Sequence, residues 1–173
     1  GSATIRSMLS KGIYSPVATV RKHSDNAISN CQVIEIDDLQ NQTDWKKHLE
    51  NIDVIIHAAA RVHMMSDQAM DPLTEYRRVN VDGTLNLAQQ AADAGVSRFI
   101  FLSSIKVNGE ATFPNNPFKP EDIPKPLDPY GITKLEAEQG LFEIADQSGM
   151  EVVCRSEERR VGKEWRSRWS PYH

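Results

Sequence analysis

Hydrophobic and polar positions follow two different periods along this chain, and the changes of period predict which segments are strands and which are helices. Short runs rich in Val, Ile and Phe are typical of strands, whereas apolar residues three and four positions apart are typical of a helix that buries one face. The run 53–58 is so uniformly apolar that both of its faces should be covered, as in a parallel sheet. Strands are predicted at 17–21, 32–36, 53–58 and 98–103, and from 151 to 154.

Helices are predicted at 2–11, 44–50, 71–94 and 128–148. The two longest open with Asp71-Pro72 and Asp128-Pro129, an N-cap residue followed by a proline at the first helical position. Between them, the segment 107–127 holds five prolines and three asparagines, so we expect a long loop that borders a site. The alternation of strands and helices predicts the α/β class, with a Rossmann-like doubly wound parallel sheet.

The composition is that of one ordinary soluble domain, with 173 residues, 39% of them hydrophobic, and a net charge of −4. The acidic excess argues against a nucleic-acid surface, and no apolar run approaches the roughly 20 residues of a membrane span. Cys31 and Cys154 lack the spacing of a disulfide framework, which favours a reducing cytoplasm. His57 and His63 have no carboxylate or cysteine set beside them, so no metal site is predicted.

The strongest candidate for chemistry is the segment Asp128-Pro129-Tyr130-Gly131-Ile132-Thr133-Lys134. Tyr130 and Lys134 are four residues apart on a predicted helix and therefore share one face. A phenol ordinarily titrates near 10, so proton exchange at neutral pH needs a nearby cation that stabilises the phenolate. Lys134 can be that cation. Because this spacing also occurs by chance in many helices, the context has to decide.

That context is the upstream segment Phe101-Leu102-Ser103-Ser104-Ile105-Lys106-Val107-Asn108-Gly109. With it, the chain resembles the extended short-chain dehydrogenases, the NAD-dependent epimerase/dehydratase family, over residues 1–153. In that family the catalytic hydroxyl lies five residues before the glycine, so the resemblance implies a catalytic trio of Ser104, Tyr130 and Lys134. Ser104, Lys106 and Tyr130 would contact the substrate.

The resemblance also implies a binding site for NAD or NADP. Asp38 would accept a hydrogen bond from the adenine amino group, and Leu39 would pack against the adenine ring. Asn80 would tie its helix to the active-site strand. The other implied cofactor-binding residues are the small Ala58, Ala59 and Ala60, the strand-end hydrogen-bonding Ser103, and the catalytic Tyr130 and Lys134.

The choice between the two nucleotides depends on Arg21. Gly1 is either the last glycine of a glycine-rich turn or a cloning remnant, and Arg21 lies 20 residues after it. At the end of the second strand of such a fold, an acid would bind both ribose hydroxyls of NAD, whereas an arginine can pair with the 2′-phosphate of NADP. Arg21 therefore favours NADP.

The implied reaction moves a hydride between the nicotinamide and a carbon of a nucleotide sugar. Ile105-Lys106 stands where dehydratases of the family commonly have an acidic pair, which counts against dehydration. The run 103–110, taken together with Ala60-Arg61-Val62-His63, most resembles a bacterial polysaccharide-cluster branch of UDP-glucose 4-epimerases and of reductases of UDP-4-keto-6-deoxy-hexosamines. We place the UDP-hexose 4-epimerase, acting at the sugar C4, first and the NADP-dependent 4-reductase second. A non-catalytic NADP-binding sensor and an inactive fragment are alternatives of another class.

The resemblance implies a divided chain. Residues 1–154 are predicted to be a partial NAD(P)-binding domain, without its first strand, its glycine-rich turn and the C-terminal substrate domain. Residues 155–173 are predicted to be a non-native tail. We expect the 173 residues alone not to fold cooperatively, because strands 17–21 and 53–58 would lack their common neighbour. A homodimer through the helices 71–94 and 129–148 is also expected.

Overall fold

The computed structural model describes residues 1–22, 30–62, 71–112, 117–119 and 122–156. The chain divides into two compact units, Gly1–Leu39 and a second unit that begins at Gln40. His63, considered above as a metal ligand, and residues 157–173 of the predicted tail lie outside the described residues. Each unit is built from parallel strands and helices, which confirms the α/β class.

The first unit contains one helix and a pair of parallel strands. Helix α1, Ser2–Lys11, ends at Gly12, whose φ of 67° is a left-handed conformation that glycine adopts without strain. Strands β1, Val17–Arg21, and β2, Gln32–Ile36, pair in parallel along their whole length. All three elements have the predicted bounds.

The second unit has a parallel sheet of three strands, in which β4, Arg98–Ser103, lies between β3, Val54–His57, and β5, Glu151–Ser156. The described strands therefore form two parallel sheets and not a single one. β5 runs two residues past the predicted end at Cys154, since Ser156 still pairs with Ser103.

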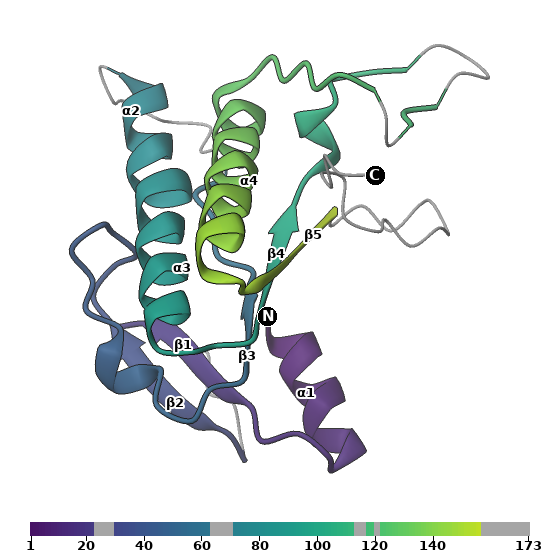
Figure 1. Ribbon diagram of the computed structural model, residues 1–173. Helices are drawn as coiled ribbons and strands as arrows, with labels where there is room; N and C mark the ends of the chain where they lie inside the picture. The colour runs from purple at the N-terminus through teal and green to yellow at the C-terminus, as the bar shows by residue number, and fades with distance from the viewer. Residues whose placement is uncertain (23–29, 63–70, 113–116, 120–121, 157–173) are drawn as a thin grey trace. The chain divides into compact units, whose positions relative to one another are not determined.

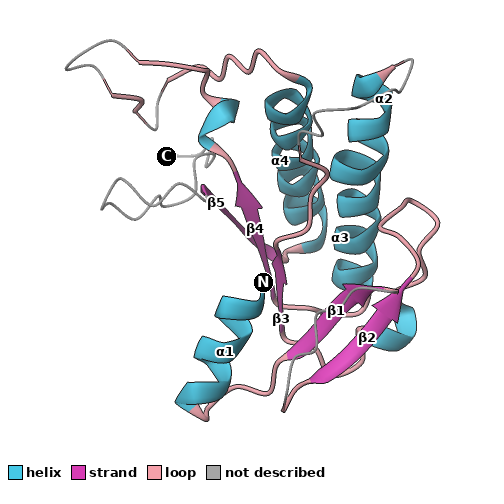
Figure 2. Ribbon diagram, turned by 180° about the vertical axis from the view of Figure 1, so that it is seen from behind, coloured by secondary structure: helices cyan, strands magenta, loops and turns pink. Residues whose placement is uncertain are grey.

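Helices cover this sheet and stand side by side (Figure 1). Helix α4, Pro129–Ser148, packs against α2, Pro72–Arg77, and α3, Thr84–Asp93. Figure 2 shows the same helices from behind, on one side of the strands β3 to β5. The apolar side chains buried in this unit include Ala91, Phe99, Phe101, Ala137 and Leu141.

The predicted uninterrupted helix 71–94 is wrong in one respect, because a π-helical segment, Arg78–Gly83, separates α2 from α3. A π turn holds one more residue than an α turn and changes which side chains face inward. Here Asn80 and Gly83 are buried. The hydrophobic period alone did not reveal this insertion, since the apolar residues on either side of it still face the core.

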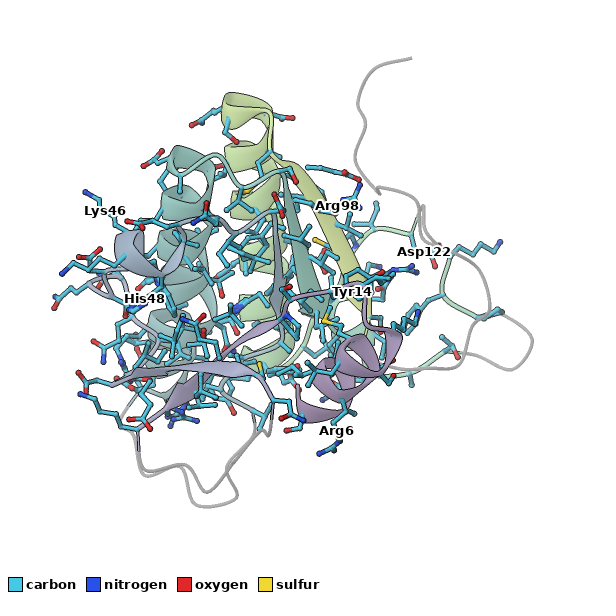
Figure 3. All side chains as sticks on the ribbon, turned by 90° about the horizontal axis from the view of Figure 1, so that it is seen from below. Arg6, Tyr14, Lys46, His48, Arg98 and Asp122 are labelled. Carbon is cyan, nitrogen blue, oxygen red and sulfur yellow. The ribbon has the colours of Figure 1, made fainter. Side chains whose placement is uncertain are left out.

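The predicted short helix 44–50 is also wrong in type and length. The structure has a 3₁₀ turn at Lys46–His48, where the Asp44 carboxylate accepts a hydrogen bond from the Lys46 N–H at 3.1 Å. Trp45 and Leu49 are buried on either side of the turn, while the exposed Lys46 side chain points outward (Figure 3).

Candidate active site

The first turn of α4 positions Tyr130. Asp128 is the N-cap, and its Oδ1 accepts a hydrogen bond from the Gly131 N–H at 2.6 Å, while Pro129 occupies the first helical turn. Tyr130 is half-buried and Lys134 is 1% exposed one turn further on. The cap and the proline thus start the helix at a fixed residue, and this fixes the position of Tyr130 in its first turn.

Lys134 brings its ammonium group to the carboxyl end of the sheet. The Nζ atom donates a hydrogen bond to the Leu102 carbonyl oxygen at 2.5 Å and lies 3.8 Å from the centre of the Phe101 ring. An aromatic face attracts a cation, and the effect is larger where water is excluded. Both contacts stabilise a positive charge that is almost completely buried.

Ser104 follows the last residue of β4. It caps the 3₁₀ turn Ile105–Val107, and its Oγ accepts a hydrogen bond from the Lys106 N–H at 3.4 Å. A Cβ atom placed on Gly131 would lie 2.8 Å from the Lys106 carbonyl oxygen, so the first turn of α4 lies directly against this 3₁₀ turn. The structure therefore brings the segments that carry Ser104 and Tyr130 together.

Ser103 has a different partner from its neighbour. Its hydroxyl donates a hydrogen bond to the carboxylate of Glu138, and both side chains are buried. Glu138 was not among the predicted site residues. Its spacing of four from Lys134 could have identified it, because residues four apart share one face of a helix.

Asn80 links three segments through its carboxamide. Its Oδ1 accepts a hydrogen bond from the Arg61 N–H at 2.7 Å, and its Nδ2 donates to the Arg61 carbonyl and to the Thr133 Oγ1, each at 3.1 Å. The π-helical segment is thereby tied to the chain just after β3 and to α4, whereas the sequence predicted a link to the active-site strand. The link holds Thr133, the neighbour of Lys134, in place.

His57 ends β3 in a buried, aromatic environment. Its Nε2 shares a hydrogen bond with the Thr84 Oγ1 at 2.9 Å, and its ring stacks on that of Phe101 at 5.8 Å between centroids. Burial first, and then the positive charge of Lys134, lower the pKa of His57 to about 3. The imidazole is neutral at physiological pH.

Lys106, a predicted substrate contact, forms ion pairs with two carboxylates. Its ammonium group binds the carboxylate of Asp128, the cap of α4, and that of Glu110 at 3.2 Å. These hydrogen bonds, first to Asp128 and then to Glu110, raise the pKa of Lys106. A substrate would therefore have to share Lys106 with these two carboxylates.

The arrangement after β3 fits a bound dinucleotide. Ala58 and Ala59 are exposed and Ala60 is half-buried at the carboxyl end of a parallel strand. Ligands of open α/β sheets bind at this end of the strands, and small side chains there leave room for a close approach. The neighbouring strand β4 ends close to the buried ammonium group of Lys134, which donates to the Leu102 carbonyl.

The remaining predicted cofactor residues lie in the first unit. Gly1 caps α1, and its carbonyl accepts a hydrogen bond from the Ile5 N–H at 3.2 Å. Arg21 is exposed at the carboxyl end of β1. The Asp38 carboxylate accepts a hydrogen bond from the Leu39 N–H at 2.9 Å, and Leu39 is buried.

Two further observations concern metals and membranes. In the described ranges, no three His, Cys, Asp or Glu side chains come together in a way that could hold a metal ion. None of the helices built from described residues is long and apolar enough to cross a membrane.

A parallel α/β fold with a Tyr-x-x-x-Lys helix packed beside a serine at the end of a strand defines the short-chain dehydrogenase class. Residues 1–164 match the model of the NAD dependent epimerase/dehydratase family, and the chain belongs to that family. It is 47% identical, over 153 residues, to a UDP-glucose 4-epimerase of Vibrio cholerae; the match covers 88% of this chain and 46% of that protein. The chain thus spans about half the length of this relative.

Solved structures that share the fold include the following two. One is MoeE5 in complex with UDP-glucuronic acid and NAD, with a TM-score of 0.71 and 27% identity over 90% of this chain and 49% of the other. The other is the UDP-glucuronic acid 4-epimerase of Bacillus cereus in complex with NAD, with a TM-score of 0.72 and 25% identity over 89% of this chain and 51% of the other.

Proposed function

We propose that this chain is the cofactor-side part of an NAD(P)-dependent UDP-hexose 4-epimerase. The observation that carries the proposal is the position of Tyr130 and Lys134 on α4, with the first turn of that helix against the turn that Ser104 caps. The 47% identity to a UDP-glucose 4-epimerase supports it.

The proposed roles follow from the chemistry of each side chain. A nicotinamide cofactor, when bound, would supply the hydride chemistry that oxidises and re-reduces the sugar C4. Tyr130, as phenolate, takes the proton of the C4 hydroxyl when the hydride leaves and gives it back when the hydride returns. Ser104 donates a hydrogen bond to the same oxygen. Lys134 stabilises the phenolate by its charge and binds the nicotinamide ribose.

Two substitutions test these roles in the protein as its gene encodes it. Tyr130→Phe should lower kcat by about 10²- to 10⁴-fold, with little effect on cofactor affinity, because it removes only the proton transfer. Lys134→Ala should lower kcat and weaken cofactor binding together. Epimerisation is measured with UDP-glucose and UDP-galactose, and cofactor affinity by titration. A Tyr130→Phe enzyme with full turnover would contradict the assignment.

Arg21 supports a second candidate, the NADP-dependent reductase of a UDP-4-keto-6-deoxy-hexosamine. The guanidinium is exposed at the end of β1, where a 2′-phosphate could pair with it. An epimerase needs no net supply of reduced cofactor, whereas a reductase consumes one NADPH for each product. Stoichiometric loss of NADPH absorbance with the keto sugar, and no interconversion of UDP-hexoses, would favour the reductase.

A non-catalytic NADP-binding sensor and an inactive fragment are the candidates of another class. A sensor would bind NADP without turning over any UDP-sugar, and a fragment would do neither. The complete set of Ser104, Tyr130 and Lys134 supports the enzyme. The same assays distinguish the three, if cofactor binding is measured separately from turnover.

The proposal also covers the substrates, the cellular location and the oligomeric state of the enzyme. UDP-sugars would be its substrates, in the bacterial cytoplasm and in the synthesis of a surface polysaccharide. A homodimer through the helices 71–94 and 129–148 is part of it, and sedimentation of the protein with and without cofactor tests this.

A further inference from the structure

Two consecutive residues of β4 each form a hydrogen bond with a side chain of α4. The Leu102 carbonyl accepts a hydrogen bond from Lys134, and the Ser103 hydroxyl donates one to Glu138. Lys134 and Glu138 are one helical turn apart, and Ser103 and Glu138 are 3% and 8% exposed. The strand and the helix are thus joined at two successive points, of which the proposed mechanism uses only the first.

These two joints lie next to the reacting groups. Ser104 follows Ser103 directly, and Tyr130 comes one turn before Lys134 on the same helix. A slip of α4 along β4 would therefore move the phenol relative to the Ser104 hydroxyl. The Ser103–Glu138 hydrogen bond opposes such a slip, because a buried carboxylate that loses a donor is costly.

The charge of Glu138 also acts within this region. On β5, the pKa of the Cys154 thiol is raised by burial and then by the negative charge of Glu138, while the positive charge of Lys134 lowers it. On β3, the positive charge of Lys134 also contributes, after burial, to the lowered pKa of His57. Glu138 and Lys134 therefore act on Cys154 with opposite signs, from successive turns of α4.

We infer that Ser103 and Glu138 are positioning residues of the active site, which fix α4 on β4 and partly offset the charge of Lys134 that acts on Tyr130. This inference rests on the proposed roles of Tyr130 and Lys134. Ser103 sets the geometry through its hydroxyl. Glu138 has two effects, as the acceptor of that hydroxyl and as a negative charge about 12 Å along the helix from Tyr130.

Three variants separate these effects. Ser103→Ala removes the hydrogen bond and should lower kcat about tenfold without changing the KM of the sugar more than twofold, and Ser103→Thr, which keeps a hydroxyl, should restore kcat. Glu138→Gln keeps an acceptor but removes the charge. It should move the acid limb of the pH–kcat profile to lower pH by about half a unit, because a negative charge nearby disfavours the phenolate.

Glu136→Gln is the matched control, since Glu136 is on the same helix but pairs with Arg77 at the surface and should leave kcat and the profile unchanged. A second readout needs no substrate. The phenolate absorbance of Tyr130, taken as the difference from the corresponding Tyr130→Phe protein, should show the same shift of its ionisation midpoint in Glu138→Gln.

The outcomes distinguish this inference from the proposed function. If UDP-hexoses are not interconverted but the phenolate midpoint moves in Glu138→Gln, the proposed substrate is wrong and the positioning role stands. If Ser103→Ala keeps full kcat and Glu138→Gln moves neither the profile nor the midpoint, the pair only stabilises the fold, even where Tyr130→Phe is inactive. A lower melting temperature in these variants, with kcat, the pH profile and the phenolate midpoint unchanged, would also mean that the pair only stabilises the fold.

Discussion

At the scale of single residues, burial decides the protonation of His57. Its pKa of about 3 in the folded protein lies below the ordinary value of 6.5. The unfolded chain therefore takes up a proton below pH 6.5 that the folded protein does not. Above pH 6.5 His57 does not affect the free energy of unfolding. As the pH falls from 6.5 towards 3, the free energy of unfolding decreases, because protonation of His57 in the unfolded chain favours unfolding.

We predict that the His57 imidazole does not titrate between pH 5 and 8. Its ring proton signals, identified by their absence in His57→Asn, should keep a constant NMR shift over that range. The free energy of unfolding should fall by about 1.4 kcal/mol per pH unit from this group below pH 6.5. In His57→Asn the free energy of unfolding should therefore depend less steeply on pH between 5 and 6.5, by about that amount. A ring signal that moves with a midpoint near 6.5 would exclude the buried neutral state.

The two adjacent serines show what residue type alone leaves open. Either hydroxyl could serve Tyr130, and the resemblance assigned the role to Ser104. In the structure Ser103 donates to Glu138 and Ser104 caps the next turn, so the two hydroxyls have different partners although they are neighbours in sequence.

At the scale of elements, the contact between α4 and the turn after β4 determines where Tyr130 lies. Gly131 makes this contact possible, because a Cβ there would lie 2.8 Å from the Lys106 carbonyl oxygen and 3.1 Å from Pro126. Backbone atoms cannot turn aside as the end of a side chain can. The helix would have to move away.

We predict that Gly131→Ala destabilises the protein by about 1–3 kcal/mol and lowers kcat as well, because the shift displaces the neighbouring Tyr130. Gly140→Ala is the control on the same helix. The atoms nearest to its Cβ would belong to the Leu85 side chain, with the two methyl carbons at 2.6 and 2.8 Å, so Leu85→Ala should relieve the clash. Gly140→Ala should change the melting temperature but not the kcat of folded enzyme. Equal kcat losses in both variants would argue against a special role for the Gly131 contact.

At the scale of the whole molecule, a cofactor that binds only the folded protein should raise its stability. The shift is about 2.7 kcal/mol at a cofactor concentration 100 times the Kd. For the protein as its gene encodes it, we predict a larger rise in melting temperature with NADPH than with NADH. Arg21→Ala should remove the difference between them. A larger rise with NADH in the unchanged protein would exclude the NADP preference.

Much of the architecture follows from the sequence, because the period of apolar residues and the capping residues act locally. The strands 17–21, 32–36 and 98–103 are confirmed, as are α1 and the span of α4 between Asp128 and Gly149. Tyr130 and Lys134 share one face because they are four residues apart on a helix, but their assignment as a pair with Ser104 needed the upstream segment 101–109 as well. The elements and this spacing need no knowledge of distant parts of the chain.

The features that the sequence did not predict depend on partners far apart in the chain. The π-helical segment is stabilised where Asn80 meets Arg61 and Thr133, and the second joint of α4 depends on Ser103 facing Glu138, 35 residues away. The neutral state of His57 results from burial against Phe101 and Thr84, which no local pattern encodes. The sequence by itself determined most of the elements and the shared helix face of Tyr130 and Lys134. Only tertiary packing decided the partners of each side chain, and therefore its charge and direction.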